Sequence, residues 1–209
     1  MAAGPPRRTL VHCRNSWPEG VRHNGLVSTE QGSQPDAEPV APPQRRVVLL
    51  ACVAVVALAI DIVSKIVVVS TLEDHAPVRI LGGIVYLQLI RNPGAAFSMA
   101  TGLTWVFALV AIAVAGAVIW FAGRLRSAGW AVGLGLVLAG AVGNLIDRIF
   151  RAPGPLQGHV VDFISVFGPN AEYFPVFNIA DSCITIGGVL IVLLSLLGID
   201  YDGTRRGRK

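Results

Sequence analysis

Aspartates near the ends of apolar segments are the residues of this chain best suited to acid–base chemistry. Asp147 ends the apolar run Ala128–Asp147, Asp162 lies in the connection that follows, and Asp181 lies near the start of the run Asn178–Ile199. An ionised carboxylate beside hydrocarbon costs on the order of several kcal/mol, so such residues mark functional sites that need partners. Two carboxyl groups within hydrogen-bond reach share one proton, and such a pair can activate water to hydrolyse an amide.

Asp162 and Asp181 are the better candidates for this pair, because neither has an obvious cation beside it in the sequence. Asn178 precedes Asp181 by three residues and could hold one carboxylate in place. The residues alone leave an alternative open, in which the two acids are unrelated. Asp162 would then be a loop residue, and Asp181 would serve a helix N-terminus, where negative charge is favourable.

A second polar group stands just before this pair, at Asn144, Asp147 and Arg148. Their spacing puts all three on one broad helix face, which must look into the interior of a membrane bundle. Because Arg148 is adjacent and Asn144 is one turn away, Asp147 is interpreted as a structural or positioning acid.

Asp61 and Lys65 are spaced i,i+4 on another apolar run, and this spacing predicts an ion pair. Either the two charges only neutralise each other, or the pair lines the site and orients another charged group. Ser64 with Lys65 is disfavoured as a hydrolase dyad, since neighbours on a helix point apart, and Cys183 with His159 has no third orienting residue. The scattered histidines lack metal-ligand spacing, so neither a metal nor a cofactor is predicted.

The composition is that of a membrane protein. The chain is 53% hydrophobic and 14% charged, whereas soluble domains carry about 25% charged residues. Runs of about 20 apolar residues can cross a hydrocarbon core. The sequence therefore predicts an all-α membrane protein with four transmembrane helices, at the following approximate positions: Val47–Ser70, Leu103–Ala122, Ala128–Asp147 and Asn178–Ile199.

Positive charge is distributed unevenly between the connections, and this predicts the orientation. Basic residues gather before the first run, between the second and third, and after the fourth, and such segments stay cytoplasmic. Both termini are therefore expected in the cytoplasm, and the connections 71–102 and 148–177 outside. The excess of positive charge follows from this asymmetry and does not predict nucleic-acid binding. The basic residues concerned are Arg45, Arg46, Arg124, Arg126, Arg205, Arg206, Arg208 and Lys209.

The outer connections contain structure of their own. β-branched and aromatic residues flank Gly82 and Gly83, which predicts a hairpin, and the turn signal at Asn92–Gly94 ends its second strand. A small extracytoplasmic β-sheet is thus expected, together with an aromatic-rich extracytoplasmic loop over the site. In the third run, small residues such as Ala139 and Gly143 have the four-residue spacing that lets membrane helices pack closely.

The expected domain organisation has three parts. Residues 1–44 are rich in Pro, Gly, Ser and Gln and are predicted to be disordered. Residues 45–200 form the membrane domain, and residues 201–209 form a basic cytoplasmic tail.

Several sequence motifs, taken in their order along the chain, resemble those of a known family. RNPGAAFS (91–98), GNLIDRI (143–149), VVDFI (160–164) and FNIADS (177–182) follow the Asp61–Lys65 pair in this order. Over roughly residues 45–200 the chain resembles bacterial lipoprotein signal peptidase, or signal peptidase II, a four-helix aspartyl protease of the inner membrane. The resemblance implies that Asp162 and Asp181 are catalytic. It further implies site-supporting or substrate-binding roles for Asp61, Lys65, Asn92, Asn144, Asp147, Arg148 and Asn178.

The resemblance also implies substrate, partners and location. Members of this family remove the signal peptide from prolipoproteins, cutting before a cysteine that already carries diacylglycerol, and the cyclic peptide globomycin blocks them. Membrane lipid is the other expected partner, and the active site is expected near the outer face of the bacterial cytoplasmic membrane. The oligomeric state stays open, and a monomer is compatible with the sequence.

Two segments depart from the family pattern. Residues 1–44 lie outside the common core, and Arg151–Gly158 looks like an insertion between the Asp147 motif and Asp162. Taken without the resemblance, the polar residues leave two other functions open. One is a proton-conducting transporter with Asp61, Asp147 and Asp181 as relay sites, and the other is a scaffold assembled through the glycine-rich run.

Overall fold

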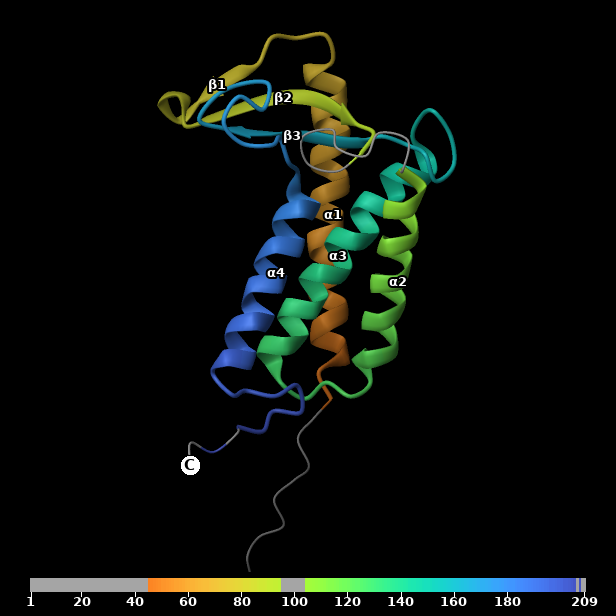
Figure 1. The fold of residues 1–209 in the computed structure, drawn as a ribbon, viewed down its shortest axis with the longest axis vertical. Coiled ribbons are helices and arrows are strands. Elements are labelled where there is room, and N and C mark those ends of the chain that lie inside the picture. The colour runs from red at the N-terminus through yellow and green to blue at the C-terminus, as the bar shows by residue number, and fades with distance from the viewer. Residues whose placement is uncertain (1–44, 95–103, 206, 208–209) are drawn as a thin grey trace, which may run out of the picture. The chain divides into compact units, whose positions relative to one another are not determined.

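The computed structural model describes residues 45–94, 104–205 and 207, and these described residues belong to one compact unit (Figure 1). The predictions made for residues 1–44 lie outside the described residues. Within the described ranges the chain forms four long helices, a short 3-10 helix and a three-stranded sheet. In chain order these are α1 (Val47–Leu72), β1 (Val78–Ile80), η1 (Leu81–Gly83), β2 (Val85–Asn92), α2 (Thr104–Ala122), α3 (Ala128–Phe150), β3 (Val160–Val166) and α4 (Ile179–Leu196).

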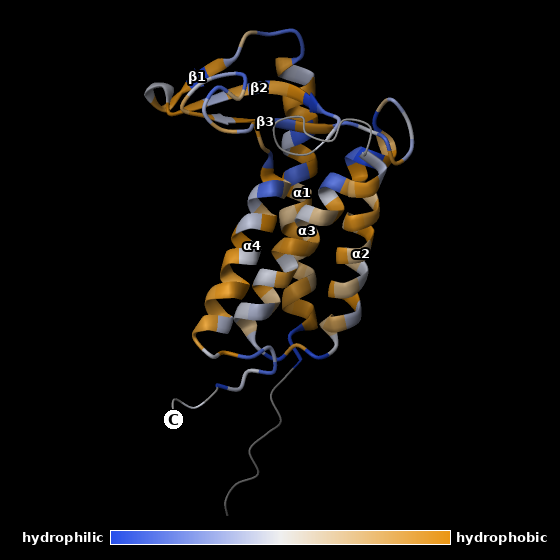
Figure 2. Ribbon diagram, in the orientation of Figure 1, coloured by the Kyte–Doolittle hydropathy of each residue, from blue (hydrophilic) through white to orange (hydrophobic). Residues whose placement is uncertain are grey.

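The long helices coincide with the predicted apolar runs to within about three residues at each end. Each of them is long and apolar enough to cross a membrane. Figure 2 shows apolar residues along the helices and polar residues where the helices meet the sheet. Large apolar side chains such as Val56, Trp120 and Val192 are exposed on the helix surfaces, as expected for surfaces that face lipid. The prediction of a helical membrane protein with a small sheet is therefore confirmed.

Helix α3 is the central helix of the bundle, and it packs against α1, α2 and α4 (Figure 1). Its small residues make this possible. A Cβ atom added to Gly140 would lie 2.3 Å from the backbone oxygen of Ala180 in α4, and one added to Gly187 of α4 would lie 2.5 Å from the oxygen of Gly133. Because the two backbones nearly touch, the predicted close packing of this helix is confirmed.

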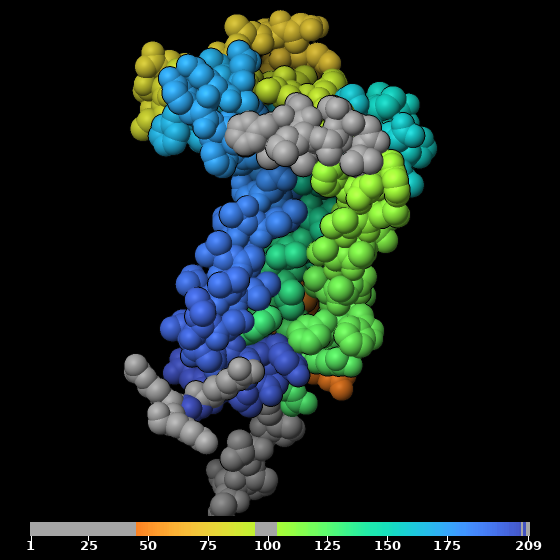
Figure 3. Space-filling model, viewed as in Figure 1, coloured from red at the N-terminus to blue at the C-terminus, as the bar shows by residue number. Residues whose placement is uncertain are grey.

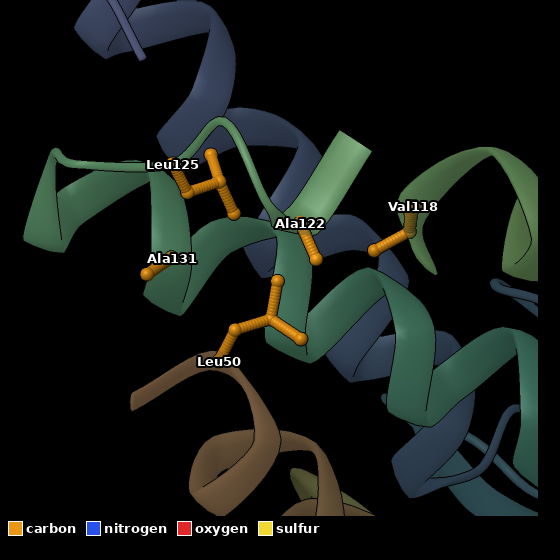
Figure 4. Packing of buried hydrophobic residues seen from close by; sticks show 5 residues of the cluster. All are labelled: Leu50, Val118, Ala122, Leu125 and Ala131. Carbon is orange, nitrogen blue, oxygen red and sulfur yellow. The ribbon is translucent and has the colours of Figure 1, made fainter. Parts of the chain in front are cut away.

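A cluster of buried apolar side chains joins α1, α2 and α3 at the end away from the sheet. It consists of Leu50, Val118, Ala122, Leu125 and Ala131 (Figure 4). The amide of Arg46 donates to the oxygen of Leu125 at 2.9 Å, and the amides of Arg126 and Ser127 donate to the oxygen of Tyr201. The three basic segments of the sequence therefore meet at one end of the bundle.

The sheet has the strand order β1–β2–β3, and both pairs are antiparallel. The hairpin predicted at Gly82 and Gly83 is confirmed, because η1 turns the chain there with positive φ at both glycines, a conformation that glycine adopts without strain. The sequence prediction for Asp162 was wrong in one respect. This residue lies in strand β3 and not in a loop.

Strand β3 is an edge strand of the sheet and contacts α1 and α3. Its alternating side chains face two different environments. Val161 and Phe163 are buried against Val68 of α1 in an apolar cluster. Side chains alternate along a strand, so Val160 and Asp162 point the other way and line a cavity. The buried apolar neighbours of Asp162 thus hold β3 in place against α1. The alternation of the strand then directs the Asp162 carboxylate into the cavity.

Substitution of Gly187 tests the close packing of α3 against α4. The Gly187→Ala change should lower stability by about 1–3 kcal/mol because the added methyl group meets the backbone of Gly133. Gly188→Ala is the matched control, since nothing lies within 4 Å of its Cβ position. Thermal unfolding of both variants in detergent measures the difference. Equal melting temperatures would contradict the packing described.

Candidate active site

A cavity of about 640 Å³ lies where β2, β3 and the start of α4 meet the ends of α2 and α3 that face the sheet. Both Asp162 and Asp181 line it, so the two carboxyl groups face one space. The cavity continues along α4 past Ser182 to Thr185 and Ile186. Its other lining residues are Asn92, Gly94, Phe107, Asn144, Arg148, Val160, Phe174, Pro175, Val176 and Phe177.

Asp162 is buried, and an amide group binds each of its carboxylate oxygens. Asn92 Nδ2 donates to Oδ2 at 2.8 Å, and Asn178 Nδ2 donates to Oδ1 at 2.7 Å. Asn92 lies two residues beyond Ile90, the partner of Asp162 across the β2–β3 ladder. It therefore reaches the carboxylate as a diagonal neighbour on the same face of the sheet.

Asn178 is fully buried and links the two aspartates. It is the N-cap of α4, where its Oδ1 accepts from the amide of Asp181 at 2.9 Å. In return, Asp181 Oδ2 accepts from the amide of Asn178 at 3.2 Å, which completes a capping box. The sequence analysis expected Asn178 to hold one carboxylate. Its side chain binds Asp162 and its backbone amide binds Asp181.

Asn144 of α3 holds Asp181 from the other side, and Lys65 determines the orientation of its amide group. Lys65 Nζ donates to Asn144 Oδ1 at 3.1 Å. Because an ammonium group can only donate, this oxygen must face Lys65. The Nδ2 group then faces Asp181 and donates to its Oδ1 at 2.8 Å.

The predicted Asp61–Lys65 ion pair is present, with Nζ 2.9 Å from Asp61 Oδ2. Lys65 also pairs with Asp147 Oδ2 at 2.9 Å. Asp61 Oδ1 accepts from the amide of Ala180, next to Asp181, so the pair supports α4 besides neutralising its own charges.

The partners of Asp147 differ from the expectation. Arg148 is its neighbour in sequence, but the cations that bind its carboxylate are Lys65 and Arg151. Its Oδ2 also accepts from the amide of Val161 at 3.2 Å. Asp147 therefore anchors the strand residue that precedes Asp162, as a positioning acid would.

Arg148 is buried and lines the cavity beside the aspartates. Its Nη2 donates to the oxygen of Gly94 at 3.3 Å, and its guanidinium carbon lies 5.4 Å from the ring centre of Phe107. Its buried Nη1 has no hydrogen-bond partner among the residues that the structure describes. A buried cationic donor without an acceptor has a cost, which a substrate oxygen in the cavity would remove.

Burial, followed by the nearby charge of Asp181, raises the pKa of Asp162 to about 7. The hydrogen bonds from Asn92 and Asn178 act against this rise, and so does the charge of Lys65. Asp162 therefore keeps its proton at acidic pH and holds it in about half of the molecules near pH 7.

The charges at this site balance only if one carboxyl group is neutral. Among the described residues, the connected acids are Asp61, Asp147, Asp162 and Asp181, and the cations among them are Lys65, Arg148 and Arg151. Four carboxylates against three cations leave one negative charge, and one bound proton cancels it. The count agrees with the proton held by Asp162.

The sequence analysis missed several residues of the site. Phe107, Ser182 and Thr185 line the cavity but lie in apolar helices, where such side chains are common. The β-branched and aromatic residues of VVDFISV (160–166) are typical of a strand, but its apolar and polar residues do not alternate clearly enough to predict the direction of Asp162. Nothing in the sequence pairs Arg151 with Asp147 except their i,i+4 spacing at the helix end.

These features define a multi-pass membrane protein with a polar, carboxylate-lined cavity at one end of its helical bundle. The model of the family described as signal peptidase (SPase) II matches residues 53–197. The chain is similar to the lipoprotein signal peptidase of Rhodococcus jostii strain RHA1, with 52% identity over 185 residues that cover 87% of this chain and 91% of the relative. It is equally similar to the lipoprotein signal peptidase of Mycobacterium tuberculosis strain H37Rv, with 52% identity over 182 residues and 87% of each chain covered.

Two solved structures of a bacterial membrane enzyme, obtained by the in meso method at 1.9 and 2.3 Å resolution, have a similar fold. Their TM-scores are 0.63 and 0.60 at 30% identity, and the matches cover 75% and 77% of this chain and 98% and 94% of theirs. The chain belongs to the signal peptidase II family, and the resemblance inferred from the sequence motifs is confirmed. It is thus a membrane protease, and neither the transporter nor the scaffold interpretation is needed.

Substitution of Gly143 tests the support that Asp61 gives to α4. A Cβ at this position would lie 2.5 Å from Asp61 Oδ2, so Gly143→Ala should displace Asp61 from Lys65 and from the N-terminus of α4. We expect a loss of about 1–3 kcal/mol of stability, as for other overpacked sites. The loss should appear in thermal unfolding and be accompanied by a lower cleavage rate. Gly116→Ala, whose Cβ position is open, is the control, and equal behaviour of the two variants would refute the contact.

Proposed function

We propose that this protein is an aspartyl endopeptidase that removes signal peptides from diacylglyceryl-modified prolipoproteins, cutting before the lipid-modified cysteine. Family membership and the names of the relatives support the substrate class. The observation that carries the mechanism is the pair Asp162 and Asp181, which line one cavity and share Asn178 as a partner.

The two aspartates have different roles in this proposal. Asp181 is the base, because Asn144 and the amide of Asn178 donate hydrogen bonds to its oxygens and the N-terminus of α4 favours negative charge. Asp162 is the acid, because its raised pKa of about 7 leaves a large fraction of it protonated near neutral pH. This division follows the rule that different environments separate the roles of paired carboxyls.

The reaction then proceeds with one proton on the pair at the start and at the end. Asp181 takes a proton from water as the water oxygen attacks the scissile carbonyl carbon, and Asp162 gives its proton to the carbonyl oxygen. In the tetrahedral intermediate, Asp181 passes its proton to the amide nitrogen, and a hydroxyl proton returns to Asp162. The carbon–nitrogen bond breaks, which yields a carboxylic acid, an amine and the original pair.

Arg148 and Asn92 complete the site on the substrate side. The Nη1 of Arg148, which has no hydrogen-bond partner among the described residues, is suited to bind a substrate carbonyl, and Asn92 holds the acid in place. Hydrogen-bond donors fixed before the reaction lower its barrier, because they need not reorganise as charge develops.

The shape of the cavity supports a substrate that carries lipid. From Asp181 the cavity continues down α4 to Ile186, an exposed apolar residue of this helix, with Phe107 of α2 opposite. In Figure 3, α3 is recessed between α2 and α4 on this face. Acyl chains attached next to the scissile bond can lie along these apolar residues. Globomycin, a cyclic peptide that blocks this family, is proposed to bind the same cavity.

The orientation in the membrane follows from the basic end of the bundle. Arg46, Arg124 and Arg126 lie at the end opposite the sheet, where the connection α2–α3 contacts Tyr201. Because basic segments stay cytoplasmic, we propose that both termini are cytoplasmic and that the cavity lies near the outer face of the bacterial cytoplasmic membrane. The site is complete within one chain, so a monomer suffices.

Replacement of either aspartate by asparagine tests the mechanism. Asp162→Asn and Asp181→Asn should each lower the rate of prolipoprotein cleavage by about 10³-fold or more, because the pair can no longer exchange a proton. Cleavage of a lipidated prolipoprotein by purified enzyme in micelles, read from gels, measures the loss.

Asp74→Asn is the matched control, because Asp74 is an exposed carboxylate that follows α1 at the same end of the bundle. It should retain the full rate, and all three variants should unfold at similar temperatures. Substantial cleavage by either Asn variant of the pair would remove that residue from the reaction.

The pH dependence of cleavage tests the role of Asp162 as the acid. Because its pKa is raised to about 7, Asp162 loses its proton as the pH rises through that value. The rate should therefore fall on the alkaline side by about tenfold per pH unit. A rate that stays constant from neutral to alkaline pH would contradict this assignment.

A further inference from the structure

The connection between α3 and β3 is closed tightly at its base. The amide of Arg151 donates to the oxygen of Asp147 at 3.0 Å, and the amide of Gly158 donates to the oxygen of Arg148, also at 3.0 Å. A Cβ on Gly158 would lie 2.3 Å from the oxygen of Asp147 and 2.8 Å from that of Arg151. The segment that departs from the family pattern therefore returns directly onto the last turn of α3.

The first residue of this segment sends its side chain back to the site. Arg151 Nε donates to Asp147 Oδ1 and forms an ion pair with it. Lys65 binds the other oxygen, Oδ2, at 2.9 Å. Each oxygen of this buried carboxylate thus has its own cation, and the carboxylate cannot rotate without breaking one of the two pairs.

The orientation of Asp147 matters because its Oδ2 also accepts from the amide of Val161 at 3.2 Å. Val161 directly precedes Asp162 in β3. A rotation of the Asp147 carboxylate would release this amide and allow the start of the strand to move. A positioned group that shifts by about 1 Å can cost up to about 10²-fold in rate.

We propose that Arg151 is a positioning residue for the cleavage reaction. It holds Asp147 Oδ1, so that Oδ2 stays on the amide before Asp162. Arg151 also supplies one of the three positive charges that balance the buried acids. This inference rests on the proposed function, because cleavage is its readout.

The effect on charge gives a signature that a purely structural role would lack. The groups that face or lie near Asp162 are Asn92 from β2, Asn178 and Asp181 at the start of α4, Lys65 from α1, and Asp147 and Arg148 from α3. Removal of the positive charge of Arg151 makes the net charge around Asp162 more negative. Asp162 then holds its proton to higher pH, and the alkaline fall in rate moves in the same direction.

The test compares Arg151→Gln with Arg151→Lys over a range of pH. Arg151→Gln should lower kcat by about tenfold, as expected for a displaced group, with KM little changed, and should move the alkaline fall to higher pH. Arg151→Lys should restore the position of that fall and most of the rate. Arg79→Gln, which removes an exposed positive charge from β1, should leave both unchanged.

A double-mutant cycle shows whether Arg151 acts through Asp147. If it does, Arg151→Gln added to Asp147→Asn should cause no further loss of kcat. Fully additive losses, or a wild-type rate and pH profile for Arg151→Gln, would overturn the inference. Either result leaves the proposed function intact so long as Asp162→Asn remains inactive. An active Asp162→Asn enzyme would instead overturn the proposed function.

Discussion

The buried ammonium group of Lys65 is the point on which the arrangement of both aspartates depends. Among the described residues it forms ion pairs with Asp61 and Asp147 and donates a hydrogen bond to Asn144. Each of these three partners in turn forms a hydrogen bond to one of the two aspartates or to the residue before it. Asp61 binds the amide before Asp181, Asp147 binds the amide before Asp162, and Asn144 donates to Asp181 itself. Cations and acids that would each be costly near hydrocarbon therefore stabilise one another and at the same time set the geometry of the site.

Helix capping and the site are built from the same side chains. A helix N-terminus needs acceptors for its free amides, and at α4 these are Asn178 and Asp181 together with Asp61 from α1. The Oδ1 atom of Asn178 caps the helix, and its Nδ2 group donates to Asp162. The local stability of α4 and the approach of the two carboxyls are thus coupled, and a change that unwinds the first turn of α4 would also separate the pair.

The sequence predicted the fold well and the contacts of the site less well. Apolar runs of membrane length define the helices to within about three residues at each end, and Gly82 and Gly83 define the hairpin, because both signals are local. Asp162 was placed in a loop, since a strand flanked by a membrane helix and a Pro/Gly-rich segment has too few residues to show its period clearly. Asp147 was assigned to Arg148 because sequence proximity was the only guide, whereas Lys65 and Arg151 reach it through the tertiary fold and the closed loop. The motifs nevertheless named polar residues that line the cavity, including Asn92, Asn144, Arg148, Asp162 and Asp181.

The account depends most on one proton shared by two carboxyl groups, and infrared spectroscopy can detect that proton directly. In protein with isotope-labelled aspartate, a carbonyl stretch of a neutral carboxyl group should be present at acidic to neutral pH and should disappear as the pH rises beyond about 7. The same stretch should be missing from Asp162→Asn. A spectrum without a neutral aspartate at neutral pH, or one in which the band persists in Asp162→Asn, would contradict the shared proton.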